Sequence, residues 1–217
     1  HLVERKRRRQ IRSLVDNYLD PKVVSWLLKN PDRLHTAGIR RMVKVLDTDI
    51  EGFTTITHAI PPEQLVAQLN EYFEAVSEAA ISNGGMHDKF VGDALMMIYG
   101  FPIDEPDHAE RAVRAAQEIL RRVESLNQRW AVQGKPVFKT RIGICSGEVV
   151  MGSVGGTRRK AVTAMGDAAN LASRLEGANK RFGTRVLLAE STAKMLPADI
   201  PLRDLGEVEL RGVTEPM

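Results

Sequence analysis

The sequence contains a single cysteine, Cys145, so no disulfide can form within the chain. Cys145 lies in an apolar run, where we expect a buried thiol, and the lack of disulfides favours a reducing, cytosolic setting. No apolar run approaches the roughly 20 residues that cross a bilayer, and no signal peptide is visible. These absences exclude a disulfide-stabilised secreted domain, and we expect a cytoplasmic domain.

The chain also lacks a large excess of either charge, because its formal net charge is only +3. We therefore expect no nucleic-acid partner. The one basic block, residues 5–9, has two interpretations. It is either a juxtamembrane segment on the cytoplasmic side of a membrane anchor or a solvated helix face. Hydrophobic residues make up 43% and charged residues 27% of the chain, as in an ordinary globular protein.

The length of 217 residues suits one domain with an extension. Apolar residues recur at helical spacing from residue 2 to residue 29, and Pro21 opens a second, short helix there. We assign residues 1–40 to an N-terminal helical signalling or linker segment and residues 41–217 to a compact domain. Because the chain starts at His1 and stops at Met217 without a natural start or an evident end, we expect a piece of a longer protein.

Residues 41–147 alternate between strand and helix patterns. They predict a strand at 42–46, a helix over 65–80, a hairpin over 87–98, a helix over 109–123 and a strand at 140–145. This order is that of the ferredoxin-like βαββαβ unit, an α+β sandwich in which helices cover one face of an antiparallel sheet. A C-terminal β-α-β region follows in the prediction: a strand pair at 149–151 and 161–165, a helix over 167–180, and strands at 185–189 and 207–211.

Two aspartates lie at the centre of this predicted sheet. Asp49 ends the first strand and Asp93 lies at the Gly-Asp tip of the hairpin, so the topology should bring both carboxylates together. Two fixed carboxylates suit a two-metal site. The turn at residues 52–54 leads into a helix, and its backbone N–H groups suit a phosphate. Nucleotide phosphate chemistry is one interpretation, and in the other both acids merely cap turns.

Four motifs make a family resemblance specific. They are, in order, DIEGFT at 49–54, KFVGDA at 89–94, RIGI with SGE at 141–148, and GDAANLASRLE at 166–176. With these motifs, residues 41 to 214 resemble the class III nucleotide cyclase catalytic domain. The resemblance implies formation of 3′,5′-cyclic nucleotides from nucleoside triphosphates, with two Mg²⁺ or Mn²⁺ ions, at the interface of a head-to-tail homodimer.

Residues that match the family's motifs take on the expected roles in catalysis and binding. The expected catalytic residues are Asn170, which orients the ribose, and Arg174, which stabilises charge on the α-phosphate. The expected metal ligands are the carboxylates of Asp49 and Asp93 and the backbone carbonyl of Ile50. The expected phosphate-binding residues are Gly52, Phe53, Thr54 and Arg211. At the last of these the family often has lysine, a departure that keeps the charge and changes its geometry.

The resemblance places Lys89 and Thr163 at the positions that read the base. Lysine is the adenylyl cyclase residue at the first position, where guanylyl cyclases carry glutamate, and an ammonium can donate to adenine N1 but not to guanine N1–H. Threonine at the second resembles the subgroup reported to respond to bicarbonate. We therefore expect an adenylyl cyclase acting on ATP, with an upstream sensor or membrane domain. A guanylyl cyclase and a non-catalytic module that binds nucleotide or dimerises in signal relay remain the alternatives.

Two features stand outside this pattern. Asp47 occupies a position where the family usually has phenylalanine. It is either a third acid at the metal site or, as we expect from the cost of burying a carboxylate alone, partly exposed or paired. His58, His87 and His108 show no metal-ligand spacing, and we expect them on the surface or in loops.

Overall fold

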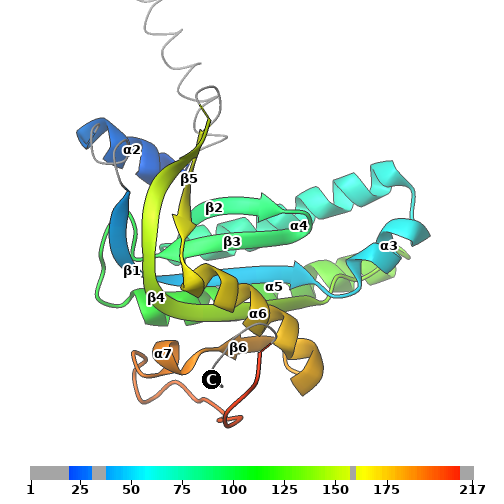
Figure 1. Cartoon of the computed structure of the whole chain (residues 1–217). Helices are drawn as coiled ribbons and strands as arrows, with labels where there is room; N and C mark the ends of the chain where they lie inside the picture. The colour runs from blue at the N-terminus through cyan, green and yellow to red at the C-terminus, as the bar shows by residue number, and fades with distance from the viewer. Residues whose placement is uncertain (1–19, 31–37, 157–159, 211–217) are drawn as a thin grey trace, which may run out of the picture.

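The computed structural model describes residues 20–30, 38–156 and 160–210. The basic block, most of the predicted N-terminal helix and Arg211 lie outside these residues. Within them, helices cover both faces of a six-stranded sheet (Figure 1). The described part of the N-terminal segment contains one helix, α2 (Pro21–Lys29). In this part of the chain, no helix combines the length and the apolar character that a membrane span requires.

The sheet is built around a long central strand, β1 (Ile39–Ile50). The strand order is β2-β3-β1-β4-β5, with antiparallel pairing throughout, and β6 pairs in parallel with β4. The other strands are β2 (Met86–Val91), β3 (Ala94–Tyr99), β4 (Thr140–Gly155), β5 (Lys160–Met165) and β6 (Val186–Leu188). The antiparallel register brings the end of β1, the β2–β3 turn and the start of β4 to the same end of the sheet.

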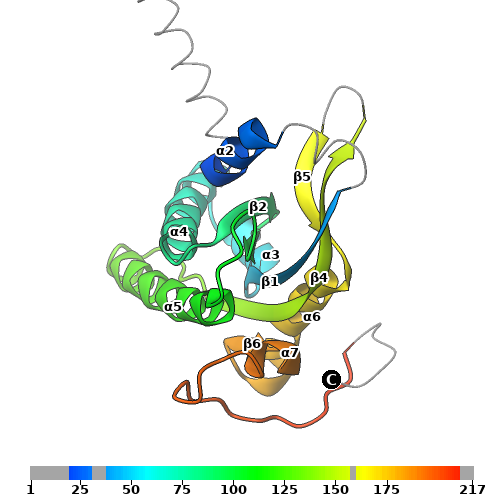
Figure 2. The ribbon, with the colours of Figure 1, turned by 90° about the vertical axis from the view of Figure 1, so that its left-hand side faces the viewer.

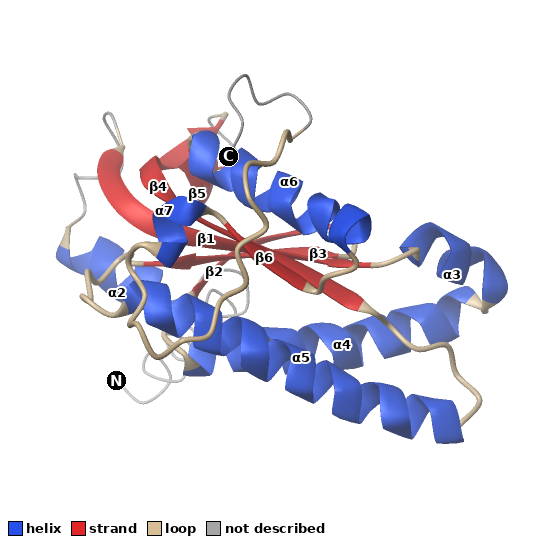
Figure 3. Cartoon of the chain, turned by 90° about the horizontal axis from the view of Figure 1, so that it is seen from below, coloured by secondary structure: helices blue, strands red, loops and turns tan. Residues whose placement is uncertain are grey.

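Alternation along β1 sends its side chains into two separate cores. Leu46 and Ile50 pack with α4 (Pro62–Ser82) and α5 (His108–Val132) on one face. Val43 and Val45 pack on the other face with α2 and with α6 (Asp167–Phe182). Figure 3 shows the sheet lying between the α4–α5 pair and α6. The short helix α7 (Glu190–Ala193) follows β6.

Helix α6 lies very close to the sheet because Gly143 on β4 has no side chain. A Cβ atom at Gly143 would lie 2.0 Å from the carbonyl oxygen of Ala172 and 2.4 Å from the backbone nitrogen of Glu176. Any larger residue would therefore push α6 away from β4. The glycine fixes the distance between α6 and the end of the sheet where the predicted site residues lie.

The sheet curls until β2 and β5, the first and last strands of its main order, meet. Although β2 and β5 stand at opposite ends of the strand order, Lys89 Nζ on β2 lies 2.8 Å from Thr163 Oγ1 on β5. Figure 2 shows β4 and β5 sweeping round past β1 toward β2. Strand twist accumulates across a sheet, and a strand of 16 residues such as β4 has the length to express it.

The structure confirms the predicted βαββαβ order, with α4 and α5 on one face of the sheet. Two predictions about strands were wrong. Residues 140–155 form one strand rather than two, because β1 pairs with β4 without a break from Ile50–Thr140 to Ile39–Met151. Residues 207–210 form no strand, since residues 201–210 have no regular secondary structure. Strand formation depends on a neighbour, and no described strand pairs with this segment.

His87 and His108 are not the surface or loop residues we predicted. His87 is half-buried in β2. His108 begins α5 and is buried, with its Nε2 3.1 Å from Lys44 Nζ and its Nδ1 3.2 Å from the carbonyl oxygen of Tyr99. Gly100 makes this packing possible, because a Cβ atom there would lie 2.3 Å from His108 Nδ1.

Candidate functional site

Asp49 and Asp93 meet at the end of β1. Asp49 is the penultimate residue of the strand, and Asp93 lies in the β2–β3 turn beside Gly92, whose φ is 64°. The backbone N–H of Ile50 donates to Asp93 Oδ2 at 3.2 Å, and the two carboxyl groups share a hydrogen bond. The structure therefore brings together the two carboxylates that the topology predicts to converge.

The two carboxyl groups crowd each other. Burial, the hydrogen bond with Asp49 and the charge of Asp49 together raise the pKa of Asp93 from its ordinary value of 3.8 to about 6. No third histidine, cysteine or acid joins them in a metal-binding group within residues 20–30, 38–156 and 160–210. Mg²⁺ commonly binds through one or two carboxylates and keeps several waters, so an all-oxygen pair of this kind fits Mg²⁺ or Mn²⁺.

Arg141 joins the carboxylate pair to α6. It stands opposite Asp49 in the β1–β4 register, and its Nη2 donates to Asp49 Oδ2 at 2.9 Å. Its Nε donates to Oε1 of the buried Glu176 at 2.8 Å. Burial and the charge of Asp49 raise the pKa of Glu176 to about 7, although Arg141 opposes the shift. Sequence reasoning assigned neither residue a role, even though both lie within the quoted motifs.

Asp47 is buried, with 6% of its surface exposed. Its carboxyl group forms a hydrogen bond with Ser173 on α6, while burial raises its pKa to about 6. Of the two outcomes that we expected, partial exposure or a partner, the structure shows the partner, and the carboxyl group is buried because α6 covers this side of β1. Within the described residues, Asp47 does not form a three-acid metal group with Asp49 and Asp93.

Beyond β1 the chain turns at Gly52 and enters the short helix α3 (Phe53–Ala59). Gly52 adopts a left-handed conformation with φ of 70°, which an L-residue with a side chain disfavours. The Phe53 ring packs edge-on against Phe138 at a centroid distance of 6.4 Å and anchors the turn, while Thr54 is exposed. The predicted phosphate-binding turn thus lies directly after the carboxylate pair.

Lys89 and Thr163 form a second cluster, where the sheet edges meet. Lys89 Nζ donates to Thr163 Oγ1 at 2.8 Å. Asp88 completes the cluster, because its Oδ2 accepts from Thr163 Oγ1 at 2.8 Å. The side chain of Asp88 is 0% exposed and that of Lys89 is 41% exposed. Sequence reasoning missed Asp88, since strand alternation would place it and Lys89 on opposite faces.

Asn170 and Arg174 lie one turn apart on the exposed side of α6. The opposite side of the helix, with Ala168, Ala172 and Leu175, is buried against the sheet. Both predicted catalytic residues thus face away from the core of their own chain. The third predicted cation, Arg211, lies outside the described residues.

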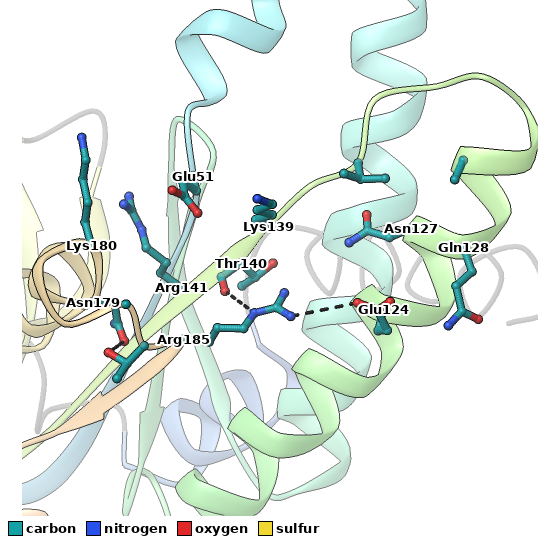
Figure 4. Close-up of a pocket in the computed structure, with 14 residues that line it drawn as sticks. Glu51, Glu124, Asn127, Gln128, Lys139, Thr140, Arg141, Asn179, Lys180 and Arg185 are labelled. Atoms are coloured by element: carbon teal, nitrogen blue, oxygen red, sulfur yellow. Dashed lines mark hydrogen bonds and ion pairs between the residues drawn. The ribbon is translucent and has the colours of Figure 1, made fainter. Parts of the chain in front are cut away.

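A cavity of about 530 Å³ opens beside the carboxylate pair, between α5, the start of β4 and the end of α6 (Figure 4). Arg185 extends across it, with Nε donating to the Thr140 carbonyl at 3.5 Å and Nη1 lying 4.0 Å from Glu124 Oε2. The other charged residues that line the cavity include Glu51, Lys139, Lys180 and Arg141. The cavity contains none of the predicted site residues, but it shares Arg141 with the carboxylate pair.

Residues 38–217 match the family model described as the adenylate and guanylate cyclase catalytic domain. The chain belongs to this family. Adenylate cyclase 1 of Rhizobium meliloti is 40% identical to this cyclase domain over 176 residues, which cover 81% of the chain and 26% of that relative. The adenylate cyclase of Anabaena cylindrica is 34% identical over 186 residues, covering 82% of the chain and 36% of the relative. The chain therefore spans about a quarter to a third of the length of these curated relatives.

Solved cyclase structures share the fold. The adenylyl cyclase CyaB from P. aeruginosa matches with a TM-score of 0.77 and 32% identity, covering 83% of this chain and 93% of that chain. The guanylyl cyclase Cya2 matches with the same TM-score of 0.77 and 29% identity, covering 83% and 91% of the two chains. Because both types of cyclase share the fold, the fold alone does not determine which nucleotide the domain uses.

Proposed function

We propose that this cyclase domain is an adenylyl cyclase, which converts ATP to 3′,5′-cyclic AMP and pyrophosphate. The observation that carries the proposal is the contact between Lys89 and Thr163 at 2.8 Å. Membership of the cyclase family supports cyclisation of a nucleoside triphosphate, and the two curated relatives described above are named adenylate cyclases. The preference for ATP over GTP rests on the chemistry of the Lys89–Thr163 pair.

Adenine and guanine present opposite hydrogen-bonding polarity to Lys89. Adenine N1 is an acceptor, so the ammonium can donate to it, whereas guanine carries N1–H, a donor that finds no partner in Lys89. A polar group left without a partner in a closed site costs about 1–3 kcal/mol. The contact with Thr163 holds Lys89 at the sheet edge, and its partial exposure leaves the ammonium accessible to a base.

Asp49 and Asp93, together with the backbone carbonyl of Ile50, are the residues that would hold two Mg²⁺ or Mn²⁺ ions. Such ions lower the pKa of a bound hydroxyl such as the ribose 3′-OH and neutralise charge on a triphosphate. The raised pKa of Asp93 supports this assignment, because a carboxyl group crowded by a second carboxylate is stabilised by a nearby dication.

The remaining residues position the triphosphate for in-line attack. The ribose 3′-oxygen attacks the α-phosphorus, its proton passes to water, and the bond to the pyrophosphate oxygen breaks. Backbone N–H groups of the turn at residues 52–54 bind the β- and γ-phosphates. Asn170 orients the ribose, and Arg174 stabilises the charge that builds on the α-phosphate. Arg211 supplies a further phosphate contact.

The active site in this proposal is shared by two chains in a head-to-tail homodimer. Within one chain, the carboxylate pair at the end of β1 and the Lys89–Thr163 contact form separate clusters. Asn170 and Arg174 face outward from α6. Cyclisation requires all of these groups around one nucleotide, so a second copy supplies the set that the first cannot bring to it.

Residues 1–40 connect the domain to an upstream sensor or membrane region in this proposal, with the domain in the cytoplasm. Helix α2 supports such a role because it is docked on the catalytic domain. Asp20 Oδ2 accepts from the backbone N–H of His87 at 3.1 Å, and the Trp26 ring lies 5.4 Å from that of Phe101. Because His87 lies two residues before Lys89, movement of α2 would displace the strand that reads the base.

The substitution Lys89→Glu tests the proposed preference for ATP. We expect it to lower the ratio of kcat/KM for ATP to kcat/KM for GTP by at least about tenfold, since glutamate accepts from guanine N1–H and repels adenine N1. Cyclic AMP and cyclic GMP formed by the purified chain with Mn²⁺ provide the measurement. Lys194→Glu, an exposed change at the residue directly after α7, is the matched control. An unchanged ratio contradicts the assignment, and tight ATP binding without turnover in the wild type favours a non-catalytic module.

The substitution Asp93→Asn tests the proposed metal site through stability. Because the folded state holds the Asp93 proton up to a pH of about 6, the free energy of unfolding falls as the pH rises from 3.8 to about 6 and stays reduced above it. Asparagine removes this penalty and still accepts from the Ile50 N–H. We expect the metal-free variant at pH 8 to melt about 2–4 °C above the wild type.

Added Mn²⁺ should reverse this order, since the dication stabilises only the intact carboxylate pair. Thermal melts with and without Mn²⁺, at pH 8 and at pH 4.5, make the comparison. An equal Mn²⁺-dependent rise in Tm for both proteins contradicts the role of Asp93 as a ligand.

A further inference from the structure

Asp88 is a buried carboxylate beside Lys89 and Thr163, the proposed base-reading pair, and it has no part in the proposed reaction. Its Oδ2 accepts from the Thr163 hydroxyl at 2.8 Å, and its Oδ1 accepts from the backbone N–H of Ala164 at 3.2 Å. Lys89 Nζ lies 3.3 Å from Oδ2, and none of the Asp88 side chain is exposed to solvent. A carboxylate is buried only with such partners, and here all of them belong to the base-reading cluster.

An irregularity in β2 brings Asp88 to this position. His87 pairs with Met97 and Lys89 pairs with Met96, so Asp88 is the extra residue between two consecutive positions of β3. Neighbouring side chains of a regular strand point to opposite faces of the sheet, and they would not both reach one residue on β5. The bulge turns Asp88 and Lys89 toward Thr163 together.

We infer that Asp88 is a positioning residue that sets the nucleotide preference by fixing the direction of the Thr163 hydroxyl. The inference rests on the proposed function, because it concerns the same base-reading site. A carboxylate only accepts hydrogen bonds, so the Thr163 hydroxyl donates its single proton to Asp88 and has none left to donate elsewhere. One lone pair of Thr163 Oγ1 accepts from Lys89. The other lone pair remains as an acceptor toward the base.

An acceptor at this position distinguishes the two purines. At the ring position next to N1, adenine carries the donor N6–H₂ and guanine carries the acceptor O6. Because its hydroxyl proton is donated to Asp88, Thr163 can accept a hydrogen bond from adenine N6 but cannot donate one to guanine O6. Lys89 and Thr163 together present a donor followed by an acceptor, which is the complement of the adenine edge.

The substitution Asp88→Asn tests this polarity. Asparagine has one acceptor oxygen and one NH₂ donor. When its oxygen accepts from the Ala164 N–H, its NH₂ donates to Thr163 Oγ1, and the hydroxyl proton is released to turn toward the base. That arrangement suits guanine O6. We expect the ratio of kcat/KM for ATP to that for GTP to fall by at least about tenfold, with Tm recorded for each variant.

The matched control is Thr163→Val, which keeps the side-chain shape and removes the hydroxyl. Alone, it should lower the ATP-to-GTP ratio by about tenfold, because adenine N6 loses its acceptor. In the Thr163→Val background, Asp88→Asn should change the ratio by less than about twofold, because Asp88 acts through the hydroxyl. A purely structural role for Asp88 would instead lower both kcat/KM values equally and leave the ratio unchanged.

The outcomes separate this inference from the proposed function. If the wild type forms cyclic AMP but Asp88→Asn leaves the ratio unchanged, or changes it equally with and without the Thr163 hydroxyl, the inference is overturned and the function stands. If Asp88→Asn does not fold, an unchanged ratio in Thr163→Val alone overturns the inference. If the wild type turns over neither nucleotide, the proposed function fails. The ratio of Kd values for ATP and GTP, measured on the same variants, then decides the inference in the same way.

Discussion

Replacement of Arg174 by alanine is expected to lower kcat by about 100- to 1,000-fold while changing KM for ATP by less than about threefold. Arg174 lies on the exposed side of α6, one turn after Asn170. In the proposed reaction, negative charge builds on the α-phosphate only as the 3′-oxygen approaches. A cation there stabilises the transition state far more than bound ATP. Steady-state kinetics on the purified protein separate the two effects.

Two variants control this experiment. Arg181→Ala removes an arginine from the same helix, where the guanidinium lies 5.2 Å from the centroid of the Phe182 ring. It should leave kcat close to the wild-type value. Arg174→Lys keeps the charge without the planar donor geometry and should fall between the wild type and the alanine variant. A rise in KM at constant kcat in Arg174→Ala would show a role in binding ATP and contradict the proposed role.

A mixture of two inactive variants should recover activity if the active site is shared between chains. Asp93→Ala removes a proposed metal ligand, and Lys89→Ala removes a proposed base reader. Each variant alone carries the same defect in both sites of its homodimer. In a heterodimer of the two variants, one active site carries both substitutions and the other carries neither. An equimolar mixture should therefore reach about a quarter of wild-type activity, since half of the dimers are mixed and each has one working site of two.

The control mixture combines two lesions that fall on the same side of the shared site. Asp49→Ala with Asp93→Ala leaves every site without a complete metal-binding pair, so no activity should return at any ratio. The dependence of activity on total protein concentration gives an independent measure of dimerisation. Failure of the Asp93→Ala and Lys89→Ala mixture to recover activity would place both residues in a single pocket of one chain.

The convergence of Asp49 and Asp93 was predictable because it follows from strand order. A hairpin that pairs with the first strand of a βαββαβ unit must place its tip beside that strand's end. Lys89 and Thr163 could be placed together only through the family resemblance, because they lie on strands at opposite ends of the strand order. Their contact depends on the curl of the whole sheet, which no local pattern in the sequence specifies.

The supporting residues were not predictable, for three separate physical reasons. Asp88 reaches Thr163 through a bulge, and alternation along a regular strand would point it to the opposite face from Lys89. Glu176 reaches Arg141 because Gly143 lets α6 approach β4, a tertiary contact. The burial of His108 depends on Gly100 in the preceding loop. In each case a missing side chain or an extra residue, rather than a periodic pattern, determines the position.

In the proposed homodimer, Arg141 would connect the two active sites. It binds Asp49, which serves one site in the proposed dimer, and Glu176 on α6, the helix whose Asn170 and Arg174 serve the other site in that proposal. A cation at Asp49 competes with the Arg141 guanidinium for the same carboxylate. In that dimer, occupancy of one site would therefore be linked to the helix that completes the other site, and linkage of this kind is reciprocal. Cooperativity between the two sites would then be transmitted through a single guanidinium.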